Sequence, residues 1–316
     1  MLTQQIFGPV YLIDSPYHGD TGVLGTYLVK SQEPMLIDPG PATQVPGVFD
    51  GLKELKINTL RFIGLTHIHL DHSGGAWRIA EAFPEADVYS HPRGIEHLID
   101  PSKIVNDAKR FFGDKFDLYG DVKGVSAVRI SESKDGDVID LQGALLKIIW
   151  TPGHASHSQC FWEPDYRILI AGDSAGSYSK RSGNIFPVSP PPFNPEKAIE
   201  SADKLIQLKP EILCYSHFGF TYDAEKKLIF YREQLVQWST ATQKGLEEGL
   251  DLQGIWLMLK DDDPILRLAN EENAERMRRA AIPNLLGFVE FYKWKRREEI
   301  KNPESNPSKG VPPTSI

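Results

Sequence analysis

The stretch that decides the fold is Thr66-His67-Ile68-His69-Leu70-Asp71-His72. It places three imidazoles and one carboxylate within six residues, at the end of the apolar segment 60–66, which we predict to be a strand. Imidazole nitrogens bind zinc, iron and other first-row metals, and a carboxylate adds a hard oxygen ligand. In an extended chain His67 and His69 would share one face, whereas a turn would direct Asp71 and His72 to a second point. The stretch therefore predicts two metal positions, and neither pair fills a coordination sphere by itself.

The remaining ligands are expected from three distant positions. Each candidate lies shortly after a segment that reads as an apolar strand: His154 follows 145–150, Asp173 follows 166–171 and His217 follows 211–216. When such strands end at one edge of a sheet, the side chains beyond their ends come together. We therefore expect a seven-ligand site made of His67, His69, Asp71, His72, His154, Asp173 and His217.

The chain divides into a strand-rich part and a helical part. Strands alternate with helices in the first half, and a similar pattern begins again near residue 127, which suggests two stacked α/β halves. Strand signals stop after about residue 222, and the periodic segment 224–246 predicts a long helix. We expect one domain over 1–222, an α-helical extension over 223–301, and a disordered, proline-rich tail over 302–316.

Composition excludes several classes of protein. The 316 residues carry 35 basic and 43 acidic side chains, a net charge of −8, so a nucleic-acid partner is not expected. No run of 18 apolar residues predicts a membrane span, and the N-terminus lacks the basic and apolar regions of a secretory signal. Two cysteines, Cys160 and Cys214, cannot form a disulfide framework and indicate a reducing compartment. We therefore expect a cytoplasmic protein.

Five segments together resemble the motifs of the metallo-β-lactamase-fold hydrolases. Residues 66–72 resemble the family's THxHxDH motif. The other four are Leu36-Ile37-Asp38-Pro39-Gly40, Thr151-Pro152-Gly153-His154, Ala171-Gly172-Asp173 and Ser216-His217. The resemblance covers about residues 6–220 and is greatest to the glyoxalase-II-like branch. True β-lactamases usually carry a cysteine where this chain has Asp173.

This resemblance implies an α/β fold, a four-layer αββα sandwich, with a dinuclear metal site at one edge and the helical extension appended. One metal would be held by His67, His69 and His154, the other by Asp71, His72 and His217, and Asp173 would bridge them. The two divalent ions are expected to be zinc, with iron or manganese as alternatives.

The reaction implied is hydrolysis of a thioester or carboxylic ester of a small molecule. Two ions about 3.5–4 Å apart lower the pKa of a bridging water until hydroxide forms near neutral pH. Asp71 is the candidate catalytic residue, because it would orient this nucleophile. Lactone opening or phosphodiester hydrolysis on the same site are alternatives, as are a mono-iron enzyme similar to the persulfide dioxygenases and a non-catalytic metal-binding scaffold.

Other residues have two open interpretations each. We call residues 66–72 the metal loop. Asp38 either supports this loop or forms a turn before Pro-Gly, and His157 either supports the site or is a satisfied strand-edge histidine. Tyr178 and Phe218 either line a substrate pocket or pack in the core. The Pro-rich loop 187–195 either forms a wall of the site or serves as a connector.

Three further histidines and the helical extension complete the set of expectations. We expect His91 and His97 at the surface and His18 at a hairpin tip. The extension over 223–301 is a candidate lid for the site or a candidate homodimer interface.

One catalytic motif competes with the metal site. Residues 172–176 read Gly-Asp-Ser-Ala-Gly and fit the GxSxG nucleophile elbow of serine hydrolases, with Ser174, Asp203 and His217 in the required order. The helix that must follow such an elbow is not predicted, because residues 177–184 are turn-like. This hypothesis also leaves the histidine stretch without a role.

Overall fold

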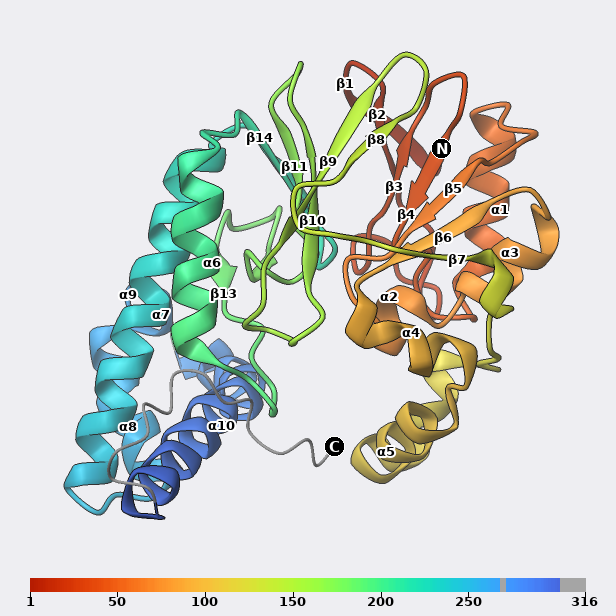
Figure 1. Cartoon of the computed structure of the whole chain (residues 1–316). Helices are drawn as coiled ribbons and strands as arrows, with labels where there is room; N and C mark the ends of the chain where they lie inside the picture. The colour runs from red at the N-terminus through yellow and green to blue at the C-terminus, as the bar shows by residue number, and fades with distance from the viewer. Residues whose placement is uncertain (268–270, 302–316) are drawn as a thin grey trace.

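The computed structural model describes residues 1–267 and 271–301, with the backbone alone at 271–277 and at 280 (Figure 1). Two β-sheets face each other in the middle of the molecule, and helices cover the outer face of each. This layering confirms the predicted αββα sandwich. The predicted tail, 302–316, lies outside the described residues.

The first sheet has seven strands in sequence order. They are β1 (Thr3–Phe7), β2 (Val10–Ile13), β3 (Thr26–Val29), β4 (Met35–Ile37), β5 (Phe62–Gly64), β6 (Asp87–Ser90) and β7 (Ile130–Glu132). Strands β1 to β4 pair antiparallel, whereas β4 to β7 pair parallel. Parallel neighbours need a crossover, which α1 (Val45–Glu54) supplies before β5 and α3 (Ala76–Ala82) supplies before β6.

The second sheet has six strands in the order β15-β14-β11-β10-β9-β8. They are β8 (Val138–Asp140), β9 (Leu145–Trp150), β10 (Gln159–Glu163), β11 (Ile168–Ile170), β14 (Ile212–Tyr215) and β15 (Gly219–Thr221). Its one parallel pair, β11 with β14, is joined through α6 (Pro195–Gln207). A separate two-stranded ribbon of β12 (Ser177–Tyr178) and β13 (Ile185–Phe186) lies between β11 and α6 in the chain.

Alternate residues of the central strands pack in opposite directions. In β3, Tyr27 and Val29 join the core between the two sheets, whereas Leu28 joins the core that includes residues of α1 and α3. In β4, Ile37 faces the inner core and Leu36 the outer one. Because both faces are buried, such strands read as continuous apolar runs, which is why the sequence predicted them well.

The C-terminal helices pack on one another and, through the first of them, against α6 at the outer side of the second sheet (Figure 1). They are α7 (Ala224–Glu247), α8 (Leu252–Asp262), α9 (Pro264–Arg267) and α10 (Glu271–Lys301). Many of their buried side chains, with Trp238 fully enclosed, belong to the same apolar core as Leu169 and Leu213 of the sheet, whereas Phe291, Tyr292 and Trp294 of α10 form a separate cluster. The domain boundary at residue 222 remains a prediction.

The insertion between β6 and β7 was not predicted from the sequence beyond a helix start. It holds α4 (Pro92–Ile99), α5 (Ser102–Phe112) and two 3-10 helices, η1 (Gly113–Tyr119) and η2 (Ala127–Arg129). The expectation that His91 lies at the surface is wrong, because it is 7% exposed, caps α4 by accepting a hydrogen bond from Arg93 N (3.1 Å), and packs on Trp150. His97 is half-buried, whereas His18 is exposed at the Tyr17–Asp20 turn.

Two predictions from composition can be compared with the structure. Both cysteines, Cys160 and Cys214, are free and buried. Across residues 1–267 and 271–301, no helix is both long enough and apolar enough to span a bilayer.

Edge strand β1 was not predicted from the sequence, because four of its five residues are at least partly exposed, which leaves no apolar run to recognise.

Candidate metal centre

The sandwich gathers the seven candidate ligands at one edge. Strand β5 ends at Gly64, and the chain continues through His67 and His69 into the short helix α2 (Leu70–Ser73), which contains Asp71 and His72. The other three follow strands of the second sheet: His154 follows β9, Asp173 follows β11 and His217 follows β14. Segments up to about 150 residues apart in sequence therefore meet here because parallel and antiparallel strands end at the same edge.

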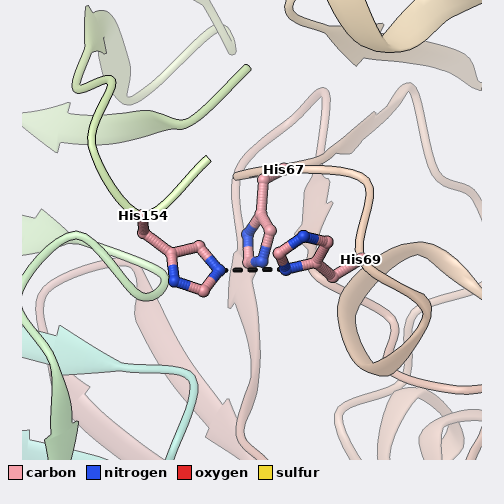
Figure 2. A group of neighbouring side chains, drawn as sticks. All are labelled: His67, His69 and His154. Carbon is pink, nitrogen blue, oxygen red and sulfur yellow. Dashed lines mark hydrogen bonds between the residues drawn. The ribbon is translucent and has the colours of Figure 1, made fainter. Parts of the chain in front are cut away.

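The ligand atoms form three overlapping trios. Within each trio, all the nitrogen and oxygen atoms lie within 4.8 Å of one another. The trios are His67, His69 and His154; His67, His72 and Asp173; and Asp71, His72 and His217. Figure 2 shows the three imidazoles of the first trio directed at one point, with His154 Nε2 2.9 Å from His69 Nδ1.

Asp173 lies between the outer trios. Its Oδ2 is 3.5 Å from Nε2 of His154 and 3.5 Å from Nε2 of His217, and its Oδ1 is 3.5 Å from Nε2 of His72. One carboxylate therefore faces ligands of both outer trios, which is the position a bridging ligand needs. On the far side, Asp71 Oδ2 is 3.3 Å from His217 Nε2.

The donor set fits divalent cations. Nε2 of His67, Nε2 of His72 and Oδ1 of Asp173 are buried and have no hydrogen-bond partner among the described residues. An unpaired buried polar atom costs about 1–3 kcal/mol, so three of them at one point need a common partner. Imidazole nitrogens and carboxylate oxygens are suitable ligands for zinc, iron or manganese.

Neighbouring groups hold the imidazole rings in orientation. Asp38 is buried, and its Oδ2 accepts hydrogen bonds from His72 Nδ1 (3.0 Å), Thr66 Oγ1 (2.6 Å) and Ser216 Oγ (3.0 Å). Its Oδ1 accepts a hydrogen bond from the backbone N–H of Thr66 (2.8 Å). On the other side, the Val188 carbonyl accepts from His154 Nδ1 (2.8 Å). In both rings the opposite nitrogen, Nε2, is thereby directed at the centre.

Without a bound metal, burial lowers the pKa of some ligand imidazoles, whereas neighbouring carboxylates raise the pKa of others. Burial, followed by the neighbouring His154, lowers the pKa of His69 to about 3. Burial opposes the charged form of His217 as well, but Asp173 and Asp71 outweigh it and raise its pKa to about 10. Burial would raise the pKa of Asp173, yet the charges of His217, His72 and His154 hold it well below its usual range. A metal that binds here therefore displaces protons from imidazole.

A cavity of about 510 Å³ opens onto the trios. Its walls come from the metal loop, from α4 and α5 of the unpredicted insertion, and from the Pro-rich loop, of which Val188 and residues 190–194 line the space. His157 also lines it, close to His67 (ring centroids 6.3 Å apart), and its Nδ1 is buried without a partner among the described residues. A satisfied strand-edge histidine is therefore the wrong interpretation of His157.

Two candidate pocket residues face elsewhere. Phe218 belongs to the apolar core between the sheets, where burial of its ring is favoured. Tyr178 stacks on Tyr215 with ring centroids 4.9 Å apart. Neither is among the described residues that line the cavity.

The serine-nucleophile hypothesis has no support in the geometry. Ser174 Oγ is hydrogen-bonded to Thr151 Oγ1 (2.8 Å). Asp203 instead accepts a hydrogen bond from Arg232 Nε (2.9 Å), and strand β12 rather than a helix follows the motif. His217 pairs with Asp71 and Asp173, so the three residues do not form a triad.

Comparison with known proteins identifies the family. A model of the metallo-beta-lactamase superfamily matches residues 19–217, so the chain belongs to this superfamily. The metallo-beta-lactamase fold-containing protein ST1585 of Sulfurisphaera tokodaii is 30% identical over 167 residues, covering 52% of this chain and 62% of the relative. The solved structure of ST1585 superposes with a TM-score of 0.67 at 23% identity, over 90% of this chain and 99% of that one.

Two further relatives have names that state an activity. Hydroxyacylglutathione hydrolase of Hydrogenovibrio crunogenus is 24% identical over 269 residues, which are 81% of this chain and 84% of the relative. Human acyl-coenzyme A thioesterase MBLAC2 is 32% identical over 114 residues, which are 34% of this chain and 39% of the relative.

Proposed function

We propose that this chain is a dinuclear metal-dependent hydrolase that cleaves a thioester or carboxylic ester of a small molecule. The observation that carries the proposal is the position of Asp173 between two ligand trios, with unpaired buried atoms directed at the same centre. The names of the hydroxyacylglutathione hydrolase and the acyl-coenzyme A thioesterase among the relatives support thioesters as the substrate class.

The residues have separate roles in this proposal. His67, His69 and His154 would hold one divalent ion, Asp71, His72 and His217 would hold the other, and Asp173 would contact both. When bound, such ions supply Lewis acidity and lower the pKa of water towards 7. The side chain of Asp71 is 26% exposed and lines the cavity, so its carboxylate is placed to orient an attacking water. Zinc is the metal that we propose.

Elemental analysis of the purified chain and a thioester hydrolysis assay test the proposal together. We expect close to two metal ions per chain, and loss of turnover by at least about 1000-fold in Asp173→Asn and Asp173→Ala because the shared ligand is removed. Asp203→Ala is a matched control, since that carboxylate is partly exposed on α6, pairs with Arg232 of α7 and does not line the cavity.

Three outcomes would contradict the proposal. Near-normal turnover in both Asp173 variants with both ions retained would exclude a bridging role. One iron per chain together with oxygen consumption would favour a mono-iron dioxygenase. Bound metal without hydrolysis of any thioester or ester would favour a scaffold.

A further inference from the structure

The cavity beside the metal centre has two chemically different sides. α4 adjoins the His67–His69 segment, because a Cβ atom at Gly94 would lie only 2.6 Å from Ile68 Cγ2. α5 passes the other half of the metal loop, where Ala108 and Leu70 share a buried cluster. Moving along the loop from His67 towards Asp71 therefore means moving from α4 towards the second half of α5.

The side next to α4 is cationic. Arg93 and His97 line the cavity from α4, Lys103 from the first turn of α5, and Lys197 from α6 on the opposite wall. Lys197 is paired with Glu200 (2.6 Å), but within residues 1–267 and 271–301 neither Arg93 nor Lys103 has an ion-pair partner. We call Arg93 and Lys103, whose charges are unpaired in the described part of the chain, the cationic side.

Acidic groups do not balance this charge. Besides Asp71 and Asp173, whose carboxylates face the metal positions, the carboxylate that lines the cavity is that of Asp107. It lies 3.5 Å from Arg110, which reduces its influence on the cavity. A cavity wall that presents unpaired cations attracts an anionic group of the ligand.

The side next to Asp71 is aromatic. Phe111, Phe112 and Tyr119 line the cavity there, and the Phe112 ring lies 5.2 Å from that of Tyr119. Phe111 is 58% exposed and its ring centroid lies 4.9 Å from that of Phe112, so the two rings form a contiguous exposed apolar surface, the kind that marks a ligand or partner site. Along α5, Phe111 lies about 12 Å from Lys103, at 1.5 Å per residue. We call Phe111, Phe112 and Tyr119 the aromatic side.

A thioester has two halves that extend from its carbonyl carbon in opposite directions. We infer that the substrate is a thioester whose thiol half is anionic and binds on the cationic side, and whose acyl half is an apolar chain that lies along the aromatic side. The cavity volume of about 510 Å³ falls within the range of sites for small organic ligands. This inference rests on the proposed thioester hydrolysis and adds to it which residues select each half of the substrate.

The thiol half is tested by calorimetric binding of three thioethers that cannot be hydrolysed: S-hexyl coenzyme A, S-hexyl glutathione and S-hexyl-N-acetylcysteamine. We expect at least one of the two anionic ligands to bind about tenfold or more tightly than the neutral one, as a charge-assisted contact provides. Tighter binding of the coenzyme A compound indicates phosphate as the recognised anion, and tighter binding of the glutathione compound indicates carboxylate.

Charge reversal identifies the residue. Lys103→Glu should weaken binding of the preferred anionic thioether about tenfold and leave the neutral one unchanged. Lys115→Glu is the matched control, because Lys115 is exposed on η1 and does not line the cavity. Equal affinity for all three thioethers, no binding of any, or the same effect from both charge reversals would overturn the inference.

The acyl half is tested with S-methyl, S-hexyl and S-decyl derivatives of the preferred thiol. Affinity should rise with chain length, by up to about fourfold for each methylene that becomes fully buried. Phe111→Ala should flatten this dependence, whereas Phe7→Ala should not, since Phe7 is 53% exposed on the unrelated strand β1. A flat dependence in the unaltered protein would overturn this half of the inference.

Binding and turnover separate this inference from the proposed function. If thioesters are hydrolysed but neither charge nor chain length affects binding, the inference fails and the proposed function stands. If binding shows both dependences but no thioester is hydrolysed, the two-sided cavity stands and the proposed hydrolysis fails.

Discussion

Asp38→Asn is expected to weaken metal binding at the Asp71, His72 and His217 position without unfolding the chain. Asparagine has nearly the same shape as aspartate, and it tolerates the positive φ of 50° at this position. Asp38 touches no candidate metal position itself. It acts through His72, whose Nδ1 donates to Asp38 Oδ2 at 3.0 Å.

The size of the effect follows from the hydrogen bonds on Oδ2. In the variant, an amide NH₂ would replace an oxygen that now accepts from Thr66, Ser216 and His72. The two hydroxyls can rotate and accept instead, but His72 Nδ1 can accept only if its proton moves to Nε2, the nitrogen that would bind metal. Either the tautomer is wrong or a hydrogen bond to a charged group is lost, at about 1.5–3 kcal/mol. This corresponds to about 10- to 100-fold in metal affinity.

Competition titration with a chromophoric chelator measures this loss. We expect one of the two metal positions to weaken about 10- to 100-fold and thioester turnover to fall with it. Ser216→Ala is the control, because it removes a hydroxyl from the same oxygen but leaves the His72 hydrogen bond in place. Unchanged metal affinity in Asp38→Asn, or an equal loss in Ser216→Ala, would refute the reasoning.

Three other outcomes are expected. Because Asp173 and Asp71 raise the pKa of His217 to about 10, metal binding at pH 7 should release protons, and metal affinity should rise with pH up to about pH 10. Calorimetry in buffers of different ionisation enthalpy counts the released protons. Metal binding without proton release would contradict this prediction. Ser174→Ala should keep turnover within about threefold, because its hydroxyl bonds Thr151 rather than a catalytic base; a large loss would restore the serine mechanism. Asp263→Ala should lower the free energy of unfolding in urea by about 2–4 kcal/mol, because Asp263 caps α9 and accepts from Trp238 Nε1 (2.8 Å); a loss below about 1 kcal/mol would show that water satisfies these donors.

Much of the fold was predictable because its central strands are apolar on both faces. β11 and β14 are short, apolar and followed by a ligand candidate, so local patterns located both the strand and the residue after it. Edge strand β1 was missed because its exposed residues are mostly polar and leave no apolar run. The α4–α5 insertion was missed although both of its helices are amphipathic.

The orientation of individual side chains was not predictable in the same way. Tyr178 and Phe218 flank a ligand, yet one stacks on Tyr215 and the other turns into the core between the sheets. His91 read as a surface residue, but Trp150 of the other sheet covers it. A local pattern indicates that a residue is apolar or polar, but not which distant element packs against it.

The sequence by itself determined the chemical nature of the site. Its five imidazoles, three in the histidine motif, one beyond β9 and one beyond β14, and its two carboxylates, Asp71 and Asp173, all lie in short motifs. Such ligands are recognisable because their types and spacing obey the requirements of a metal ion. Only the tertiary structure decided that Asp38 would orient His72 and that α4 and α5 would line the cavity with cations at one end and aromatic rings at the other. The physical reason is that these relations are contacts between residues far apart in the chain, and they exist only after the sheets have paired and packed.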